Sequence, residues 1–200
     1  MSSTTMLQLV QQATNELGVP TPVTVAGNTN QDVIQILALM NASGYELLRK
    51  ADWRELTTTY SFFAEYATTT GDYTTSALTI TNIPSTAGLD TTYMVVGTGF
   101  PNATFITSVD SGTQVTVSAY STSAITAGTI YFQKVKYALP SDYDSIVPRT
   151  QWDKSKHWEM LGPESAQQWE WLLSGFISTG PRIRWRLLGS YFQIWPGFSN

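Results

Sequence analysis

Residues 93–118 read YMVVGTGFPNATFITSVDSGTQVTVS, in which short apolar runs alternate with glycine, proline, asparagine and serine. Runs of β-branched and aromatic residues between turn formers are typical of short strands. The same pattern extends outward to about residues 67–133, where the only charged residues are Asp72, Asp90 and Asp110. We therefore predict an all-β domain, a sandwich or a barrel, over residues 67–133.

The two flanks of this segment have a different composition. No Lys or Arg occurs between Arg54 and Lys134, and all seven Trp residues lie outside that interval. Such an abrupt change indicates that the β segment is inserted into a second body. We therefore predict an α+β protein in which residues 1–66 and 134–200 form a helical bundle frame. This frame would contain about three main helices and a C-terminal β-hairpin.

Apolar residues recur at helical spacing in two N-terminal stretches. The first helix is predicted over Met6–Leu17, between a Thr5 cap and a Gly18 stop, and the second from an Asn30 cap to Lys50. Small side chains in the second helix let another helix approach closely. That neighbour is either the first helix or a helix of another subunit, and the small residues are Ala38, Ala42 and Gly44.

A third helix is predicted to begin at Pro163 and to end at Gly175 or Gly180. Its inner face would consist of Ala166, Trp169, Leu172, Leu173 and Phe176. After it, alternation of Arg with apolar residues predicts a final hairpin that turns at Gly189-Ser190 and returns over Tyr191–Trp195.

Two further strands are expected where the chain passes between frame and insert. A strand near Leu56–Phe63 leaves the frame, because its side chains alternate at a period of two, and a strand near Thr129–Tyr137 returns to it. We predict that these two strands pair as a stem. Pairing of adjacent ends would leave the frame's core intact.

Composition excludes several classes of function. The net charge is -4 and there is no Cys, so a polybasic nucleic-acid binder, a disulfide and a zinc–thiolate site are all excluded. No apolar run approaches the roughly 18 residues of a membrane span, and the N-terminus does not resemble a signal peptide. We expect a protein made in the cytosol, without membrane, cofactor or metal.

Catalytic residues are sparse. His157 is the sole histidine, and no Gly-x-Ser-x-Gly motif supplies a nucleophile for it to activate. Asp142, Asp144 and Asp153 lie near one another in sequence, but turns and caps explain such carboxylates. We therefore predict that the protein is not an enzyme. A glycosidase that uses Asp142 and Asp153 is kept as a third hypothesis.

Two groups of residues predict contact surfaces. Arg182, Arg184 and Arg186 would project from one face of a strand at a spacing of about 7 Å. They would pair with acids of a neighbouring subunit, contact DNA phosphates, or form a solvated face. Exposed aromatic residues are typical of protein interfaces and, as a rival use, of sugar sites. The interface candidates are Trp152, Trp158 and Trp171, with Trp195 added for a sugar site.

Several short motifs occur in a recognisable order. They are Glu16-Leu17-Gly18, Arg49-Lys50-Ala51-Asp52-Trp53-Arg54, Leu139-Pro140-Ser141-Asp142-Tyr143-Asp144, Trp152-Asp153, Leu161-Gly162-Pro163, Gln168-Trp169 and Gly180-Pro181-Arg182. Together they resemble the head-to-tail adaptor proteins of short-tailed bacteriophages, the tail tubular protein A-like or neck proteins. The resemblance covers about residues 6–66 and 134–196. The segment Met94–Pro101 separately resembles β modules of phage structural proteins.

The resemblance implies a structural virion protein at the head–tail junction, assembled in the host cytoplasm. It implies a ring of about twelve copies that contacts the portal protein and a tail nozzle or hub protein. Genomic DNA would pass through the lumen without sequence-specific binding. The alternative hypothesis is a tail-associated β-module protein that binds a receptor or a glycan through residues 67–133.

Overall fold

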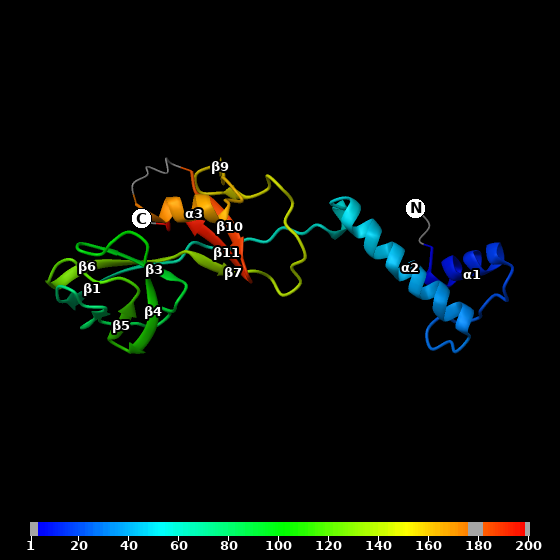
Figure 1. Ribbon diagram of the computed structural model, residues 1–200, viewed down its shortest axis with the longest axis horizontal. Coiled ribbons are helices and arrows are strands. Elements are labelled where there is room, and N and C mark those ends of the chain that lie inside the picture. Colours follow the sequence, from blue (N-terminus) through cyan, green and yellow to red (C-terminus); the bar gives the residue numbers. More distant parts are fainter. Residues whose placement is uncertain (1–3, 176–181, 199–200) are drawn as a thin grey trace. The chain divides into compact units, whose positions relative to one another are not determined.

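The computed structural model describes residues 4–175 and 182–198. The chain divides into two compact units, Met1–Thr59 and Tyr60–Asn200, here named unit 1 and unit 2. Figure 1 shows that unit 1 is helical and that unit 2 is mostly β.

Unit 1 contains two helices, α1 (Met6–Leu17) and α2 (Gln31–Lys50), which confirms both predicted N-terminal helices. Thr5 and Gln8 form a reciprocal capping box at the start of α1, and Gly18 ends it in the left-handed conformation. Asn30 caps α2 by accepting a hydrogen bond from the Asp32 N–H. The chain then runs back past α1 along α2 (Figure 1).

The core of unit 1 is small. Its buried apolar residues are Val10, Val33 and Ile36, with partly buried neighbours that include Ala13 and Met40. The helix α2 is about 30 Å long and α1 about 18 Å, at a rise of about 1.5 Å per residue. The buried residues of α2 both lie in its first half. Its second half contains no buried residue, and there the Trp53 indole N–H donates a hydrogen bond to the Leu47 carbonyl.

The predicted strand Leu56–Phe63 is wrong. A short 3-10 helix, η1 (Arg54–Leu56), follows α2, and residues 57–65 form neither helix nor strand. The reason is competition for a partner: the return strand pairs with the later segment Tyr66–Tyr73, so the earlier alternation has no neighbouring strand. Phe62 instead stacks on Tyr137, with ring centroids 4.1 Å apart.

Unit 2 contains a six-stranded antiparallel sheet with the strand order β1-β6-β3-β4-β5-β2. Hydrogen bonds between Asp72 on β1 and Thr81 just after β2 join the two ends of this order, so the sheet is a nearly closed barrel. Its strands are β1 (Tyr66–Tyr73), β2 (Thr79–Ile80), β3 (Tyr93–Gly97), β4 (Thr104–Ser111), β5 (Gln114–Val117) and β6 (Ile125–Lys134).

Alternate side chains of the strands point inward and fill the barrel. Tyr93 and Val95 on β3 point into the barrel core, whereas Met94 between them belongs to a second core outside it. A bulge interrupts β1 between Gly71 and Tyr73. Gly71 is required there, because a Cβ at this position would lie 2.8 Å from Ile80.

The second core of unit 2 lies between a sheet and a helix. The sheet order is β10-β11-β7, formed by Arg184–Leu188, Tyr191–Trp195 and Lys136–Ala138, so the predicted C-terminal hairpin is confirmed. Trp169 and Leu172 of α3 (Ala166–Leu173) pack against residues of this sheet. A separate two-stranded hairpin consists of β8 (Trp152–Asp153) and β9 (Trp158–Glu159).

The predicted helical bundle frame is therefore wrong. Within the described residues there are three α-helices in a mostly β protein, and α3 packs on a sheet. Three apolar helical faces do not imply one bundle, since a sheet is an equally good apolar partner. The third helix also begins at Ala166 under a Ser165 cap, later than predicted. Phe176 and Gly180 lie outside the described residues.

Candidate functional site

The predicted ladder of three arginines is shortened in the structure. Strand β10 begins at Arg184, so Arg184 and Arg186 lie on it and exposed Arg182 precedes it. The two strand residues both contact other groups of unit 2.

Arg184 forms an ion pair with Glu164, whose side chain is only 8% exposed, at 2.5 Å between Nη1 and Oε1. Backbone hydrogen bonds position this carboxylate. The Leu161 N–H donates to the Ile183 carbonyl and the Glu164 N–H donates to the Trp185 carbonyl, so residues 161–164 follow β10. The pair therefore fixes the segment that leads into α3.

Arg186 contacts α3 from the same strand. Its Nε donates a 2.8 Å hydrogen bond to Gln193, and its guanidinium lies 4.5 Å from the ring centroid of Trp169. Burial lowers the pKa of Arg186, and the charge of Glu170 acts in the opposite direction. Both strand arginines thus join β10 to the α3 region, a use that the sequence alternation alone did not reveal.

The three predicted interface tryptophans are on the surface of unit 2. Trp152 is 52%, Trp158 37% and Trp171 58% exposed. The first two are on the β8–β9 hairpin, and Trp171 is two residues from buried Trp169 on α3. Residues two apart on a helix face different directions, so α3 uses one Trp for packing and presents the other to solvent. Trp195, the sugar-site candidate, is buried.

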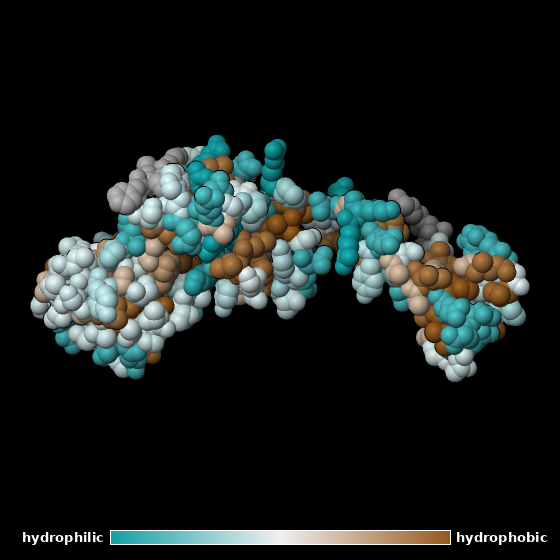
Figure 2. All heavy atoms as spheres, in the orientation of Figure 1, coloured by the Kyte–Doolittle hydropathy of each residue, from teal (hydrophilic) through white to brown (hydrophobic). Residues whose placement is uncertain are grey.

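Unit 1 carries an extensive apolar surface that the sequence pattern placed inside. Figure 2 shows hydrophobic residues in patches over the helices of this unit. The signal in the sequence was the width of the apolar faces, which exceeds what one neighbouring helix covers. The exposed large residues of α1 and α2 are Met6, Leu9, Leu17, Ile34, Leu39, Tyr45, Leu47 and Leu48.

The small residues of α2 also lack an intrachain neighbour. A Cβ added at Gly44 would meet nothing within 4 Å, and Ala38 and Ala42 are exposed. Of the two predicted neighbours for these residues, the first helix does not reach them in this way. They remain available to a helix of another molecule.

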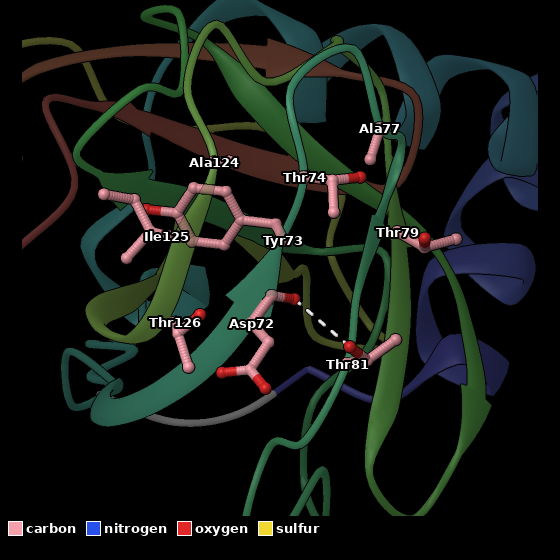
Figure 3. A pocket seen from close by; sticks show the side chains of 9 residues that line it. All are labelled: Asp72, Tyr73, Thr74, Ala77, Thr79, Thr81, Ala124, Ile125 and Thr126. Carbon is pink, nitrogen blue, oxygen red and sulfur yellow. Dashed lines mark hydrogen bonds between the residues drawn. The ribbon is translucent and has the colours of Figure 1, made fainter.

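The barrel has a shallow pocket of about 440 Å³, lined by both polar and apolar side chains (Figure 3). Its Asp72 carboxylate already accepts hydrogen bonds from the Ala127 N–H at 2.6 Å and from the Asn82 side chain at 2.5 Å. These bonds lower the pKa of Asp72, the Ala127 bond most strongly. Tyr73 lines the pocket but is buried, and the remaining lining residues are Thr74, Ala77, Thr79, Thr81, Ala124, Ile125 and Thr126.

The candidate catalytic groups have structural surroundings. Asp153 accepts hydrogen bonds from the Ser155 N–H, the Ser155 hydroxyl and the Lys156 N–H, so it stabilises the turn between β8 and β9. His157 is exposed in that turn, with a positive φ of 57°. Asp142 and Asp144 are exposed. Across the described chain, no His, Cys, Asp and Glu side chains gather in a group suited to a metal ion.

None of the helices in residues 4–175 and 182–198 has the length and apolar character needed to cross a lipid bilayer. Comparison with protein-family models, with curated proteins and with solved structures gives no match to this chain. The exposed surfaces of the two units are therefore the main guide to function.

Proposed function

We propose that the protein is a structural subunit that assembles into a ring and acts as a head-to-tail adaptor of a short-tailed phage. In this role the ring joins the portal protein to a tail nozzle or hub protein, and DNA passes through its lumen. The ordered sequence motifs support the phage assignment. The exposed apolar surface supports assembly.

The observation that carries the proposal is that unit 1 exposes more large apolar residues than it buries. Three apolar residues are buried there, whereas eight large apolar residues of its two helices are exposed. Contiguous exposed apolar surface on a soluble protein marks a contact with another molecule. Two helices with so small a core also gain little stability from each other, and burial against further copies would supply the rest.

The tryptophans of unit 2 suit a second contact. An exposed Trp at an interface contributes much of the binding energy, because its large ring loses contact with water on association. Trp152, Trp158 and Trp171 are candidates for contact with the portal or the tail hub protein. The arginine pair on β10 is assigned to packing of α3 rather than to this contact.

Native mass spectrometry of the full chain, alone and mixed with its cognate portal protein, tests the proposal. We expect a closed oligomer, either alone or bound to the portal ring. A protein that stays monomeric in both samples at micromolar concentration would contradict the proposal. A variant with Trp152→Ala and Trp171→Ala should still form the ring and should bind the portal or the tail hub protein more weakly.

The barrel pocket favours a second candidate function, a tail-associated protein that binds a receptor or a glycan. Its threonine hydroxyls and carboxylate suit a polar ligand, although its one aromatic ring, Tyr73, is buried and cannot stack on a sugar. A glycan array tests this candidate. Saturable binding that is lost in Thr81→Trp, which fills the pocket, and kept in Thr68→Trp, on β1 outside the pocket, would favour it.

A further inference from the structure

The two larger sheets of unit 2 share one run of chain, in which β7 follows β6. Val135 lies between these strands and connects the run to both sheets. Its N–H donates to the Thr92 carbonyl just before β3, and its carbonyl accepts from the Ile194 N–H on β11. One edge of the run is thus paired first with β3 and then with β11. The opposite edge pairs with β1, and the hydrogen bond nearest to β7 there runs from the Lys134 N–H to the Glu65 carbonyl.

This opposite edge is unpaired along β7. The bond at the Val135 carbonyl and a second one, from the Leu139 N–H to the Ser190 carbonyl, hold β11 on one side of β7. Backbone groups of a strand alternate in direction, so the N–H and C=O groups of Lys136 and Ala138 point to the other side. Among the described residues, no backbone hydrogen bond satisfies these groups. An open edge of this kind is a template for another strand.

Residues 61–64, here named the strap, lie beside the open edge. The Phe62 ring stacks on Tyr137 of β7 with 4.1 Å between ring centroids. Within the described chain, the backbone of the strap makes no hydrogen bond of its own. If the register of β1 and β6 is continued beyond Tyr66 and Gln133, Phe62 falls opposite Tyr137, the residue on which it already stacks. The strap is therefore in register with β7 although it is not bonded to it.

A tyrosine hydroxyl stands where the ladder stops. In an antiparallel ladder the Glu65 N–H would donate to the Lys134 carbonyl, because paired residues exchange two bonds and the Lys134 N–H already makes the other one. Here the Glu65 N–H donates to the Tyr137 hydroxyl at 3.2 Å, and this hydroxyl donates to the Lys134 carbonyl at 3.1 Å. The hydroxyl thus occupies the space of one ladder hydrogen bond.

Closure of the strap onto β7 would satisfy both backbones. In the continued register, the pairs that exchange hydrogen bonds are Phe63 with Lys136 and Ser61 with Ala138. The Phe63 side chain, now 91% exposed, would gain a cross-strand neighbour in Lys136. The ammonium of that lysine already lies 5.6 Å from the ring centroid of Phe105, so closure adds an aromatic side chain to an existing contact.

We infer that the strap is a switch with two states. It is open in this structure, and in the closed state β1 extends back to Ser61 and pairs with β7. The Tyr137 hydroxyl holds the open state. Closure removes the four strap residues from the unpaired connector between η1 and β1, which shortens that connector by about 13 Å of extended chain. The inference goes beyond the proposed function and does not depend on it, because strap and β7 both belong to unit 2.

Amide hydrogen exchange of the full chain, resolved by residue with NMR, tests the switch. Tyr137→Phe keeps the ring that stacks on Phe62 and removes the hydroxyl. In this variant we expect the amides that closure pairs to exchange about tenfold more slowly than in the native protein, because strand hydrogen bonds protect them. The amides of Phe62 and Ala64 point away from β7 and should stay fast. The amides that closure pairs are those of Ser61, Phe63, Lys136 and Ala138.

Two proline substitutions in the Tyr137→Phe background are matched controls. Phe63→Pro removes an N–H that closure needs, so the Lys136 and Ala138 amides should return to the native exchange rate. Ala64→Pro removes an N–H that faces away from β7 and suits an extended backbone, so the same two amides should stay slow. Slow exchange of the β6 amides checks that the barrel is folded in each variant.

Three exchange results would overturn the inference. The first is fast exchange of the paired set in Tyr137→Phe. The second is equal slowing at Phe62 and Ala64, which indicates general ordering in place of a strand. The third is slow exchange of the paired set in the native protein, since the strap would then be closed with the hydroxyl present.

A disulfide gives an independent measurement that keeps Tyr137, and the chain has no Cys of its own. The Cα atoms of a hydrogen-bonded antiparallel pair are about 5.5 Å apart, which a disulfide can span. Mild oxidation of Phe63→Cys/Lys136→Cys should therefore trap the closed strap and slow the Ser61 and Ala138 amides. Ala64→Cys/Lys136→Cys, whose side chains would face opposite sides of the sheet, should bridge several-fold less. Equal bridging in the two variants, or a bridge that leaves both amides fast, would overturn the register.

Discussion

Units 1 and 2 place their apolar residues in opposite ways. Unit 2 buries twenty of them in two clusters, one inside the barrel and one between α3 and the β10-β11-β7 sheet. Unit 1 buries three and exposes most of the rest. Burial within the chain makes a region stable alone, whereas the same residues on a surface make it dependent on another molecule. The comparison thus separates a unit 2 with two cores of its own from a unit 1 whose apolar residues are mostly exposed.

Charged contacts follow the same division. Both ion pairs of the described residues, Glu65 with Lys134 and Glu164 with Arg184, belong to unit 2. In unit 1, α2 carries Asp32 at its start and Glu46, Arg49 and Lys50 near its end. Unit 2 uses charge to fix its own elements.

The largest expected effect is on the core of unit 2. Trp185 is 1% exposed and stacks on Phe192 at 5.1 Å between ring centroids. Trp185→Ala should lower the free energy of unfolding by about 3–5 kcal/mol, because the cavity removes packing from both the sheet and α3. Urea denaturation followed by circular dichroism measures this. Exposed Trp171→Ala is the control and should change stability by no more than about 0.5 kcal/mol. Equal losses in the two variants would contradict the division into buried and contact tryptophans.

In unit 1, a smaller loss of folding free energy is expected to unfold the whole helix pair. Ile36→Ala truncates one of the three residues of the unit 1 core cluster and should cost about 2–3 kcal/mol. With so small a core, this should unfold α1 and α2 in the monomer while unit 2 keeps its own unfolding transition. Limited proteolysis and helical ellipticity measure it.

The matched control in unit 1 is Leu48→Ala, at an exposed position in the second half of α2. It should leave the monomer's helices intact and reduce assembly. Loss of helix in the monomer on Leu48→Ala would show that this residue packs within the chain, and the contrast between the units would fail.

Arg184→Met tests the internal ion pair. The half-buried guanidinium is removed and leaves the buried Glu164 carboxylate without its partner, which should cost about 1–3 kcal/mol. Arg184→Met/Glu164→Leu should recover part of the loss, since no unpaired charge is then buried. Exposed Arg182→Met should have little effect on stability. If Arg184→Met instead weakened only the oligomer in native mass spectra, the pair would belong to an interface.

The smallest effect is a dependence on pH. The side-chain hydrogen bond from Lys134 lowers the pKa of Glu65 below its usual 4.5, with a further contribution from the Tyr93 hydroxyl. The stabilisation is present above pH 4.5 and is lost as the pH falls through the lowered pKa. Because Glu65 is half exposed, the effect should be small. Thermal melts of the native protein and Glu65→Gln between pH 3 and pH 7 should converge at the acid end; parallel curves would exclude this role.

Local signals were sufficient for some elements and insufficient for others. Capping residues, helical spacing and a Gly-Ser turn predicted α1, α2 and the C-terminal hairpin, because caps and turns depend on neighbouring residues. The predicted strand Leu56–Phe63 was wrong, because a strand needs a hydrogen-bonded neighbour and β6 pairs with β1 instead. The third helix begins three residues later than predicted, because residues 161–164 are hydrogen-bonded to β10.

The contact residues were also predicted only in part from the sequence. Alternation on β10 predicted that Arg184 and Arg186 share a strand. It did not predict that their guanidinium groups contact Glu164 and Trp169 within unit 2. The tryptophan-rich composition led to Trp152, Trp158 and Trp171 as surface residues, which are exposed, but also to Trp195, which is buried. Helical spacing predicted wide apolar faces on α1 and α2, but not that the second half of α2 extends beyond its one neighbour in unit 1.

By itself the sequence determined where two helices and a hairpin form, and that residues without Lys, Arg or Trp make short strands, since these outcomes depend on local torsional preference and side-chain pattern. Only the tertiary structure decided which apolar faces find a partner within the chain. Burial is a property of contacts between distant segments, and the same helical face serves equally well as a core or as a binding surface until its neighbour is in place.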